Sequence, residues 1–359
     1  MRLRSLWLTD FRNYAKAELD LAPGLTAVIG PNGEGKSNLL EAIGYLATLG
    51  SFRGASNETL VRRGATGAVL RAEGTRDDRD VLIEAEIAPS GRGRVLVNRQ
   101  RLQRSRDLLG ALRVTVFSPD DLALVKDGPA ERRGYLDDTL VALQPRNDAL
   151  RADVERVLRQ RNALLRQAGG RLTADIETTL AVWDTKLIES GRLLAGERVS
   201  LLAKLRPFLA QTYAEVAGRE VPVDAQYESS WLEHGLAAAL RDVRRDELRR
   251  GVSLVGPHRD DVSLSIGGLP ARTHASQGEQ RSLALALRLA SHAVVSDTVG
   301  EPPILLLDDV FSELDPGRSH ALVEHLPKGQ AVLTTASGLP EGAQPDRVVR
   351  VEAGRLQPD

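Results

Sequence analysis

The chain has 359 residues, which is enough for two or three domains with a substantial core. Its hydrophobic content of 42% and charged content of 27% are those of an ordinary globular protein, and its net charge of −1 excludes nucleic-acid binding driven by overall charge. The lack of cysteine excludes disulfides and thiolate-bound metals, and no apolar run is long enough for a membrane helix, so we expect a cytoplasmic protein without a membrane partner.

The first third of the chain has the alternating pattern of β-strands. Apolar and polar residues alternate over residues 2–8 and 25–30, and again in three segments between residues 69 and 98. A helix is predicted from Lys36 to Leu49, in the middle of these strands. This mixture predicts an α/β fold for the N-terminal part.

The middle of the chain changes to helical spacing. Apolar residues recur every three or four positions from Leu150 to Leu165 and from Leu172 to Leu187, and Gly169-Gly170 separates the two patterns. We therefore predict a mostly helical arm at residues 120–235.

Strand patterns return after Arg250. The predicted strands are residues 252–256, 262–266, 304–309 and 331–335. The last two are almost continuously apolar, as expected for strands of a parallel sheet with both faces buried. The α/β character is thus split by the arm, and the predicted parts are residues 1–119, 120–235 and 236–359.

A glycine-rich loop follows the predicted strand 25–30 and leads into a predicted helix. It matches the phosphate-binding pattern G-x-x-x-x-G-K-[ST], in which backbone N–H groups surround phosphate oxygens. Lys36 can reach the β- and γ-phosphates of a nucleotide, and Ser37 can bind Mg²⁺. A chance glycine turn ahead of a helix is the alternative. The predicted nucleotide-binding residues are Gly30, Pro31, Asn32, Gly33, Glu34, Gly35, Lys36 and Ser37.

The strand 304–309 ends in two carboxylates, which is the second half expected of such a site. We predict that Asp308 holds Mg²⁺ together with Ser37, and that Asp309 acts as the base that polarises the attacking water. The alternative is a buried strand that ends in an acidic turn. Two adjacent carboxylates repel one another, so a nearby cation is their natural partner.

A second helix start, at residues 276–280, also has features of an anion site. Ser276, Gly278 and Gln280 occur in an order suited to holding an anion on backbone N–H groups. A plain helix cap explains the same residues, with Ser276 as N-cap and Glu279 at capping-box spacing. Both interpretations can hold at once.

These motifs together resemble the ABC-type ATPases of DNA repair, the group that includes SMC and Rad50, and most closely the RecF family of bacterial recombination mediators. The resemblance implies an α/β ABC-type ATPase head with an inserted, mostly helical arm. The segments that carry it span nearly the whole chain: DFRNY (10–14), GPNGEGKSNLLEAI (30–43), SFR (51–53), FSPDDLALVKDGPAERRGYLD (117–137), QRNALL (160–165), GPHRDD (256–261), SQGEQRSLALALRLA (276–290) and LLLDDVFSELD (305–315).

The resemblance also assigns roles to several residues. It implies that Ser276, Gln277, Gly278 and Gln280 form the signature motif, which covers the ATP bound by a second subunit in a head-to-tail homodimer. It also implies that Asp315 ends the D-loop and is a nucleotide-binding residue. On resemblance alone, Arg12 and Asn13 lie near the adenine.

Three departures from the ABC pattern favour slow hydrolysis. Thr334 or Thr335 stands where a switch histidine is usual, Asp309 replaces a longer glutamate, and Gln277 replaces a glycine. We therefore expect a switch rather than a motor.

A cluster of arginines between Gly91 and Asp107 is the predicted DNA-binding site, formed by a hairpin and a short helix. A solvated basic face is the alternative. No aromatic residues alternate with the arginines, so duplex backbone binding is favoured over base stacking. On resemblance alone, Arg53 can reach a phosphate or DNA. The predicted DNA-binding residues are Arg92, Arg94, Arg99, Arg101, Arg104, Arg106 and Arg53, with Arg151, Arg156, Arg159 and Arg161 of the arm as a weaker candidate.

The sequence thus predicts a weak, DNA-dependent ATPase that uses ATP and Mg²⁺ and closes as a dimer on duplex DNA at gaps or single-strand/double-strand junctions. The resemblance implies cooperation with RecR and RecO in loading RecA. Two alternatives are a DNA-tethering head of the SMC or Rad50 kind, which needs a much longer coiled arm, and the ATPase subunit of a transporter, which needs a surface for coupling helices.

Overall fold

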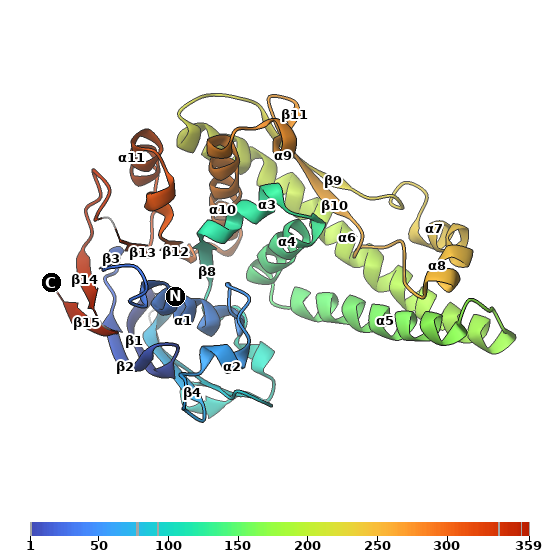
Figure 1. Ribbon diagram of the computed structural model, residues 1–359, viewed down its shortest axis with the longest axis horizontal. Helices are drawn as coiled ribbons and strands as arrows, with labels where there is room; N and C mark the ends of the chain where they lie inside the picture. The colour runs from blue at the N-terminus through green and yellow to red at the C-terminus, as the bar shows by residue number, and fades with distance from the viewer. Residues whose placement is uncertain (1, 77–78, 92, 337, 353, 359) are drawn as a thin grey trace. The chain divides into compact units, whose positions relative to one another are not determined.

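The computed structural model describes residues 2–76, 79–91, 93–336, 338–352 and 354–358 (Figure 1). The chain divides into two compact units. The first, here called the head unit, comprises Met1–Leu122, Phe208–Val221 and Ser276–Asp359. The second, the arm unit, comprises Ala123–Pro207 and Pro222–Ala275.

These units do not follow the predicted division at residues 119 and 235. The arm unit continues to Ala275 because β9 (Val223–Glu228) pairs in antiparallel register with β10 (Asp261–Ile266). A paired strand cannot be assigned apart from its partner. The division into three functional parts stays a prediction.

One sheet of the head unit carries the two predicted nucleotide-binding strands. Its order is β15-β14-β3-β13-β12-β8, and every pair except β14–β15 is parallel. All residues of β12 and β13 are buried, which confirms the prediction made from their apolar runs. Because parallel strands end at the same edge, the loop after β3 and the carboxylates after β12 lie at one edge of the sheet. The strands are β3 (Leu25–Ile29), β8 (Val114–Phe117), β12 (Ile304–Asp308), β13 (Ala331–Thr335), β14 (Arg347–Glu352) and β15 (Arg355–Pro358).

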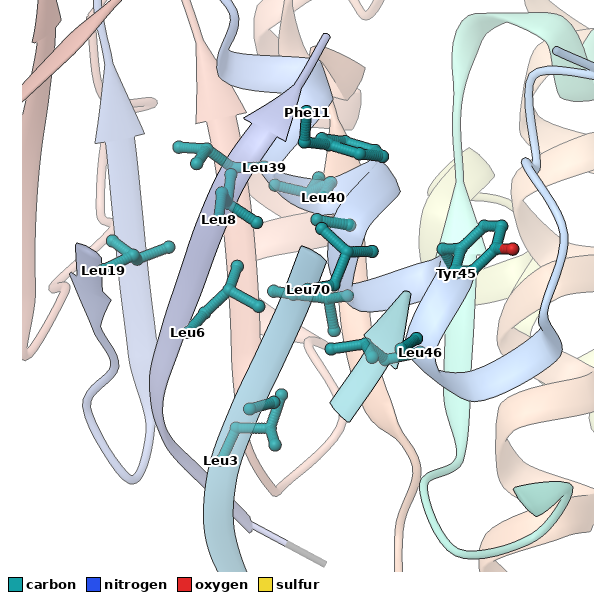
Figure 2. Close-up of a cluster of buried hydrophobic side chains, with 14 of the residues drawn as sticks. Leu3, Leu6, Leu8, Phe11, Leu19, Leu39, Leu40, Tyr45, Leu46 and Leu70 are labelled. Atoms are coloured by element: carbon teal, nitrogen blue, oxygen red, sulfur yellow. The ribbon is translucent and has the colours of Figure 1, made fainter. Parts of the chain in front are cut away.

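The other sheet of the head unit is antiparallel, in the order β2-β1-β4-β5-β6-β7. Its inward side chains pack on α1 (Lys36–Thr48), the helix that follows the glycine-rich loop. In Figure 2, Leu39 and Leu40 of α1 lie against Leu6 and Leu8 of β1, with Leu70 of β4 beside them. Each fully buried leucine contributes about 2 kcal/mol, so this core fixes the start of α1 firmly. The strands are β1 (Arg2–Phe11), β2 (Tyr14–Asp20), β4 (Ala68–Arg76), β5 (Arg79–Ile87), β6 (Arg94–Val97) and β7 (Gln100–Arg101).

The remaining elements of the head unit are helical. The longest is α10 (Gln277–Val299), whose inward face is almost wholly buried. The others are α2 (Asn57–Leu60), α11 (Pro316–Glu324) and the 3₁₀ turns η1 (Ser105–Leu108), η2 (Pro119–Leu122) and η3 (Val310–Glu313). The last turns of α6, from Phe208 on, also belong to this unit.

The arm unit is built around α5 (Asn147–Ala168) and α6 (Ala174–Ala217), which converge toward their joined ends in Figure 1. Both helices were predicted, and Gly169 ends α5 in a left-handed conformation with φ 55°. The unit also contains α3 (Ala123–Lys126), α4 (Pro129–Leu143), α7 (Leu236–Asp242), α8 (Arg244–Arg250), β11 (Leu269–Pro270) and α9 (Ala271–His274). Among the described residues, the structure contains no helix with both the length and the apolar character needed to cross a membrane.

The predicted strand at residues 252–256 is wrong. The segment is a turn whose backbone amides bind side chains: Ser253 donates to Asn162 Oδ1 at 2.8 Å, and Leu254 donates to Glu247 Oε1 at 2.9 Å. Donors that are already satisfied by side chains are not available for a strand ladder. Apolar alternation alone could not reveal this.

The weaker DNA-binding candidate in the arm is also contradicted for Arg161. Its side chain is fully buried and donates to Asp184 at 2.8 Å and to Glu247 at 2.6 Å. The other arm arginines of this group are each paired with a nearby carboxylate: Arg151 with Asp138 and Asp148, Arg156 with Asp153, and Arg159 with Glu155. Helical spacing places an arginine on a face but does not say whether that face is covered.

Candidate functional site

The glycine-rich loop between β3 and α1 has two glycines at positions where any side chain would clash with neighbouring groups. A Cβ on Gly35, which has φ 108°, would lie 2.5 Å from the amide of Asn13, and a Cβ on Gly30 would lie 2.2 Å from the carbonyl of Val351. Asn13 itself donates from Nδ2 to the carbonyl of Glu34 at 2.9 Å. The loop therefore lies close against the strand β14 and is bound by Asn13 of the turn between β1 and β2.

Lys36 lies inside this loop. Its ammonium donates to the carbonyl of Pro31 at 2.9 Å, and the residue is only 6% exposed. Burial lowers the pKa of Lys36, while the nearby carboxylates of Asp309, Asp308 and Glu34 act to raise it. These carboxylates favour the protonated form of Lys36, which is the form that can bind an anion.

Ser37 and Asp308 meet as predicted. The Ser37 hydroxyl donates to Asp308 Oδ1 at 2.7 Å, and a second hydroxyl, that of Thr334, donates to the same oxygen at 2.8 Å. Burial raises the pKa of the Asp308 carboxyl, while both hydrogen bonds act to lower it. The contact joins the first turn of α1 to the end of β12 across 271 residues of sequence.

Asp309 lies just beyond the strand in a left-handed conformation, with φ 49°. Its backbone N–H donates to Thr334 Oγ1 at 3.0 Å, and in the described part of the chain its buried Oδ1 has no hydrogen-bond partner. Positive φ in a non-glycine residue and an unpaired buried oxygen are both costly, and such features are common at functional sites.

Thr334 is thus the residue at the switch position that contacts the acidic pair. Thr335 instead donates to the carbonyl of Gly338 at 2.9 Å. The sequence left these two threonines open because both end the same buried strand. Alternation of side chains across the sheet separates them only once the register of β13 beside β12 is known.

Arg12 has a structural contact that the sequence did not predict. It donates through Nε and Nη2 to both carboxylate oxygens of Glu41, at 2.7 Å each, and through Nη1 to the carbonyl of Thr59 at 3.3 Å. Ser51 also donates to Glu41, at 2.5 Å. The edge of the guanidinium group is therefore occupied, so only its planar face is available to a nucleotide base. Glu41 lies in the quoted segment GPNGEGKSNLLEAI, yet nothing in its position marked it as this partner.

A chain of side-chain hydrogen bonds continues from Asn13 along the surface. Asn38 donates to Asn13 Oδ1 at 2.8 Å, and Arg53 donates to Asn38 Oδ1 at 3.2 Å. Together with Arg12 these residues line a surface groove of about 780 Å³. The positive charge of Arg53 also acts to lower the pKa of Asp308 against the effect of burial. Arg53 therefore lies with the nucleotide-binding elements and not with the basic hairpin.

The predicted signature turn forms a helix cap. Ser276 is the N-cap of α10: its hydroxyl accepts from the N–H of Glu279 at 3.3 Å, and its own N–H donates to the Glu279 carboxylate at 2.7 Å. This confirms the capping box, while Ser276 and Gln277 remain exposed and Gln280 is buried at 5% exposure. Gln280 is therefore placed away from any partner molecule that meets this surface.

The D-loop residue Asp315 is the N-cap of α11. Its carboxylate accepts from the backbone N–H of Arg318 at 3.0 Å and from the Arg318 side chain at 2.7 Å. These hydrogen bonds and the charge of Arg318 lower the pKa of Asp315 against the opposing effect of burial.

The basic segment forms a hairpin, β6–β7, followed by the short helix η1, as predicted. Its two-residue turn, Asn98-Arg99, has positive φ at both positions, 49° and 66°. Arg94 is paired with Glu86 through two hydrogen bonds of 2.7 Å. Arg99, Arg101, Arg104 and Arg106 are exposed and have no ion-pair partner within the described ranges, and Arg92 lies outside the described residues.

The comparisons with known proteins agree on one family. A family model described as the RecF/RecN/SMC N-terminal domain matches residues 2–352. The chain is similar to the DNA replication and repair protein RecF of Streptomyces avermitilis, with 46% identity over 352 residues and 94% of each chain covered. It is also similar to the RecF of Frankia alni, with 47% identity over 356 residues, 94% of this chain and 93% of the relative.

Solved structures give the same result. A structure of the recombination mediator protein RecF with ATP, in the RecFOR pathway, matches 100% of this chain and 97% of its own, with a TM-score of 0.91 and 29% identity. An Smc head bound to the C-winged helix domain of ScpA shares the fold alone, with a TM-score of 0.60 and 17% identity. The chain therefore belongs to the RecF family of DNA replication and repair proteins and has the predicted fold, an ABC-type ATPase head with a helical insertion.

Proposed function

We propose that the chain is a slow, Mg²⁺- and DNA-dependent ATPase of recombinational repair that closes as a head-to-tail homodimer on DNA. The observation that carries the proposal is the contact between the glycine-rich loop and the acidic strand, made by Ser37, Asp308 and Thr334. An ATP-bound RecF with nearly the same chain fold supports ATP as the nucleotide.

The residues at this contact fit a magnesium ion. Ser37 and Asp308 offer adjacent hydroxyl and carboxylate oxygens, the ligands that Mg²⁺ prefers, at the point where phosphates meet the loop. When bound, the ion would neutralise charge on the phosphate groups of the nucleotide. Lys36 binds the same phosphates, and the unpaired Oδ1 of Asp309 accepts a hydrogen bond from the attacking water. Aspartate reaches less far than glutamate, which accounts for slow turnover.

Dimerisation follows from the exposed signature turn. Ser276, Gln277 and Gly278 lie at the start of α10, where first-turn amides can hold the γ-phosphate of a nucleotide bound by another copy. The basic hairpin supplies the DNA contact through Arg99 and its exposed neighbours, at duplex regions next to gaps or single-strand/double-strand junctions. RecR, RecO and RecA are the partners proposed from the family, in keeping with the RecFOR pathway of the solved relatives.

Two substitutions test this proposal. Lys36→Met removes the cation of the loop and should abolish ATP binding in equilibrium dialysis. Asp309→Asn should bind ATP with parental affinity, stop turnover and accumulate as an ATP-bound dimer. Parental turnover in Asp309→Asn excludes Asp309 as the base, and normal ATP affinity in Lys36→Met excludes the nucleotide site itself.

The oligomeric state tests the proposed homodimer and its binding to DNA. Sedimentation velocity of the full chain, alone, with ATP, and with ATP and a gapped duplex, should show a monomer, a partial dimer and a DNA-bound dimer in that order. A monomer under all three conditions would overturn the proposed homodimer.

A further inference from the structure

Gly278 of the signature turn is a glycine for an unexpected reason. It lies in the first turn of α10, and its φ is not in the left-handed region, so its backbone does not require glycine. Alanine is favoured over glycine in helices by about 1 kcal/mol. The space that a Cβ would fill is instead taken by the side chain of Arg318, whose Nη1 would be 2.4 Å away and whose Cζ and Nη2 would be 3.1 Å away.

Asp315 holds Arg318 over this glycine. The carboxylate of Asp315 accepts from Arg318 Nη1 at 2.7 Å, and the Arg318 side chain remains 26% exposed. The nearest acid of the signature turn, Glu279, is already bound to the Ser276 amide and to Arg219. Arg318 therefore has one carboxylate partner in the D-loop, and its Nε and Nη2 form no hydrogen bond with the described residues.

A guanidinium group beside first-turn amides on an exposed surface is the arrangement that binds a phosphate group. We propose that Arg318 is a ligand, supplied in trans, of the γ-phosphate that a second copy of this chain holds at its own Lys36. Asp315 orients the guanidinium group, and Gly278 makes room for it. This inference deepens the proposed function, because it requires the shared site between two copies.

The competing explanation is structural: Arg318 only steadies the D-loop through its ion pair with Asp315. The two explanations differ in what Gly278 does. If Arg318 binds phosphate, Gly278→Ala harms the dimer by displacing the guanidinium group, so the same change should have no effect once Arg318 is gone. If the glycine serves the nucleotide directly, Gly278→Ala harms the dimer in either background.

The experiment measures the dimer dissociation constant with ATP, by sedimentation, for the full chain and for Arg318→Ala, Arg318→Lys, Gly278→Ala and the double variant. We expect Arg318→Ala to raise this constant at least tenfold. Arg318→Lys should raise it less, because lysine keeps the positive charge but lacks the planar array of N–H donors of a guanidinium group. Gly278→Ala should match Arg318→Ala, and the double variant should be no worse than either. Nucleotide affinity of the monomer should stay within twofold throughout.

A matched control is Arg249→Ala, which breaks another exposed arginine–aspartate pair at i,i+3 spacing, with Asp246. It should leave the dimer constant unchanged. Mixing Arg318→Ala with Lys36→Met should restore an ATP-dependent heterodimer, because the intact loop of the first copy then faces the intact Arg318 of the second.

The outcomes are distinct. If the parental chain does not dimerise with ATP, the proposed function fails and this inference fails with it. If the parental chain dimerises and Arg318→Ala dimerises equally well, only the role of Arg318 is overturned. An additive double variant, or a mixture that restores no heterodimer, also overturns it.

Discussion

The hydroxyl of Thr334 bridges the two catalytic candidates: it donates to Asp308 Oδ1 at 2.8 Å and accepts from the backbone N–H of Asp309 at 3.0 Å. One side chain on β13 thereby fixes both the carboxylate that faces Ser37 and the backbone turn that displays the Asp309 side chain. A threonine can do this because its hydroxyl both donates and accepts.

Thr334→Val keeps the shape of the side chain and removes both hydrogen bonds. It leaves a buried N–H without a partner, which costs about 1–3 kcal/mol of unfolding free energy, and it frees the Asp309 turn. We expect ATP turnover to fall at least tenfold while ATP affinity changes little, as measured by phosphate release and dialysis. Thr335→Val is the control, since among the described residues its hydroxyl binds the Gly338 carbonyl and neither acidic residue. Equal loss in both variants would contradict the bridging role.

The buried Asp308 makes the ion-free protein sensitive to pH. Because burial raises its pKa, the stability that its protonated form gives the fold is complete in acid and is lost as the pH rises through the folded-state pKa. At neutral pH the ionised carboxylate therefore weakens the ion-free fold. Asp308→Asn should raise the melting temperature by about 2 °C at pH 7.5 without Mg²⁺, and the gain should shrink toward pH 4.

The exposed Asp246→Asn variant is the control for this experiment and should show no such trend. A melting temperature for Asp308→Asn that lies below the parental value at pH 7.5 would show that the carboxylate stabilises the fold when ionised, against this expectation.

Arg99 at the tip of the basic hairpin supplies a positive charge but lowers the stability of the fold. Arg99 has φ 66°, a conformation that costs a residue with a side chain about 1 kcal/mol and glycine almost nothing. Arg99→Gly should therefore stabilise the protein by about 1 kcal/mol in urea unfolding and weaken duplex binding. The slope of log K against log salt should flatten by about 0.9 if one phosphate contact is lost.

Arg94→Gln is the comparison within the same hairpin. Arg94 is already paired with Glu86, so loss of the Arg94 charge should change the salt dependence of DNA binding less than loss of the Arg99 charge. An unchanged slope in Arg99→Gly would exclude the hairpin tip from the DNA contact.

Replacement of the buried Arg161 of the arm should cause a large loss of stability. Arg161→Ala leaves Asp184 and Glu247 without this partner inside the arm unit, and removing one member of a buried ion pair costs about 3–5 kcal/mol. Urea unfolding measures this directly. Arg156→Ala on the same helix, where the pair with Asp153 is exposed, should cost less than 1 kcal/mol. Similar costs for the two variants would contradict the buried network.

The sequence predicted the parts of the site that are local in the chain. The glycine-rich loop, the strand that ends at Asp308 and the capping box at Ser276 each need only neighbouring residues to be recognised. Thr334 and Glu41 could not be assigned, because their roles depend on which strand or helix lies beside them. The false strand at residues 252–256 failed for the same reason: side chains from α5 and α8 take its amides.

The order of the parallel sheet has a consequence for protein synthesis. The strand β3, which precedes the glycine-rich loop, is paired on one side with β13 and on the other with β14, and both are made about 300 residues later in translation. A nascent chain that has released only its first 300 residues from the ribosome lacks both neighbours of that strand. The edge of the sheet that carries the glycine-rich loop therefore cannot assemble fully until these two strands have been made.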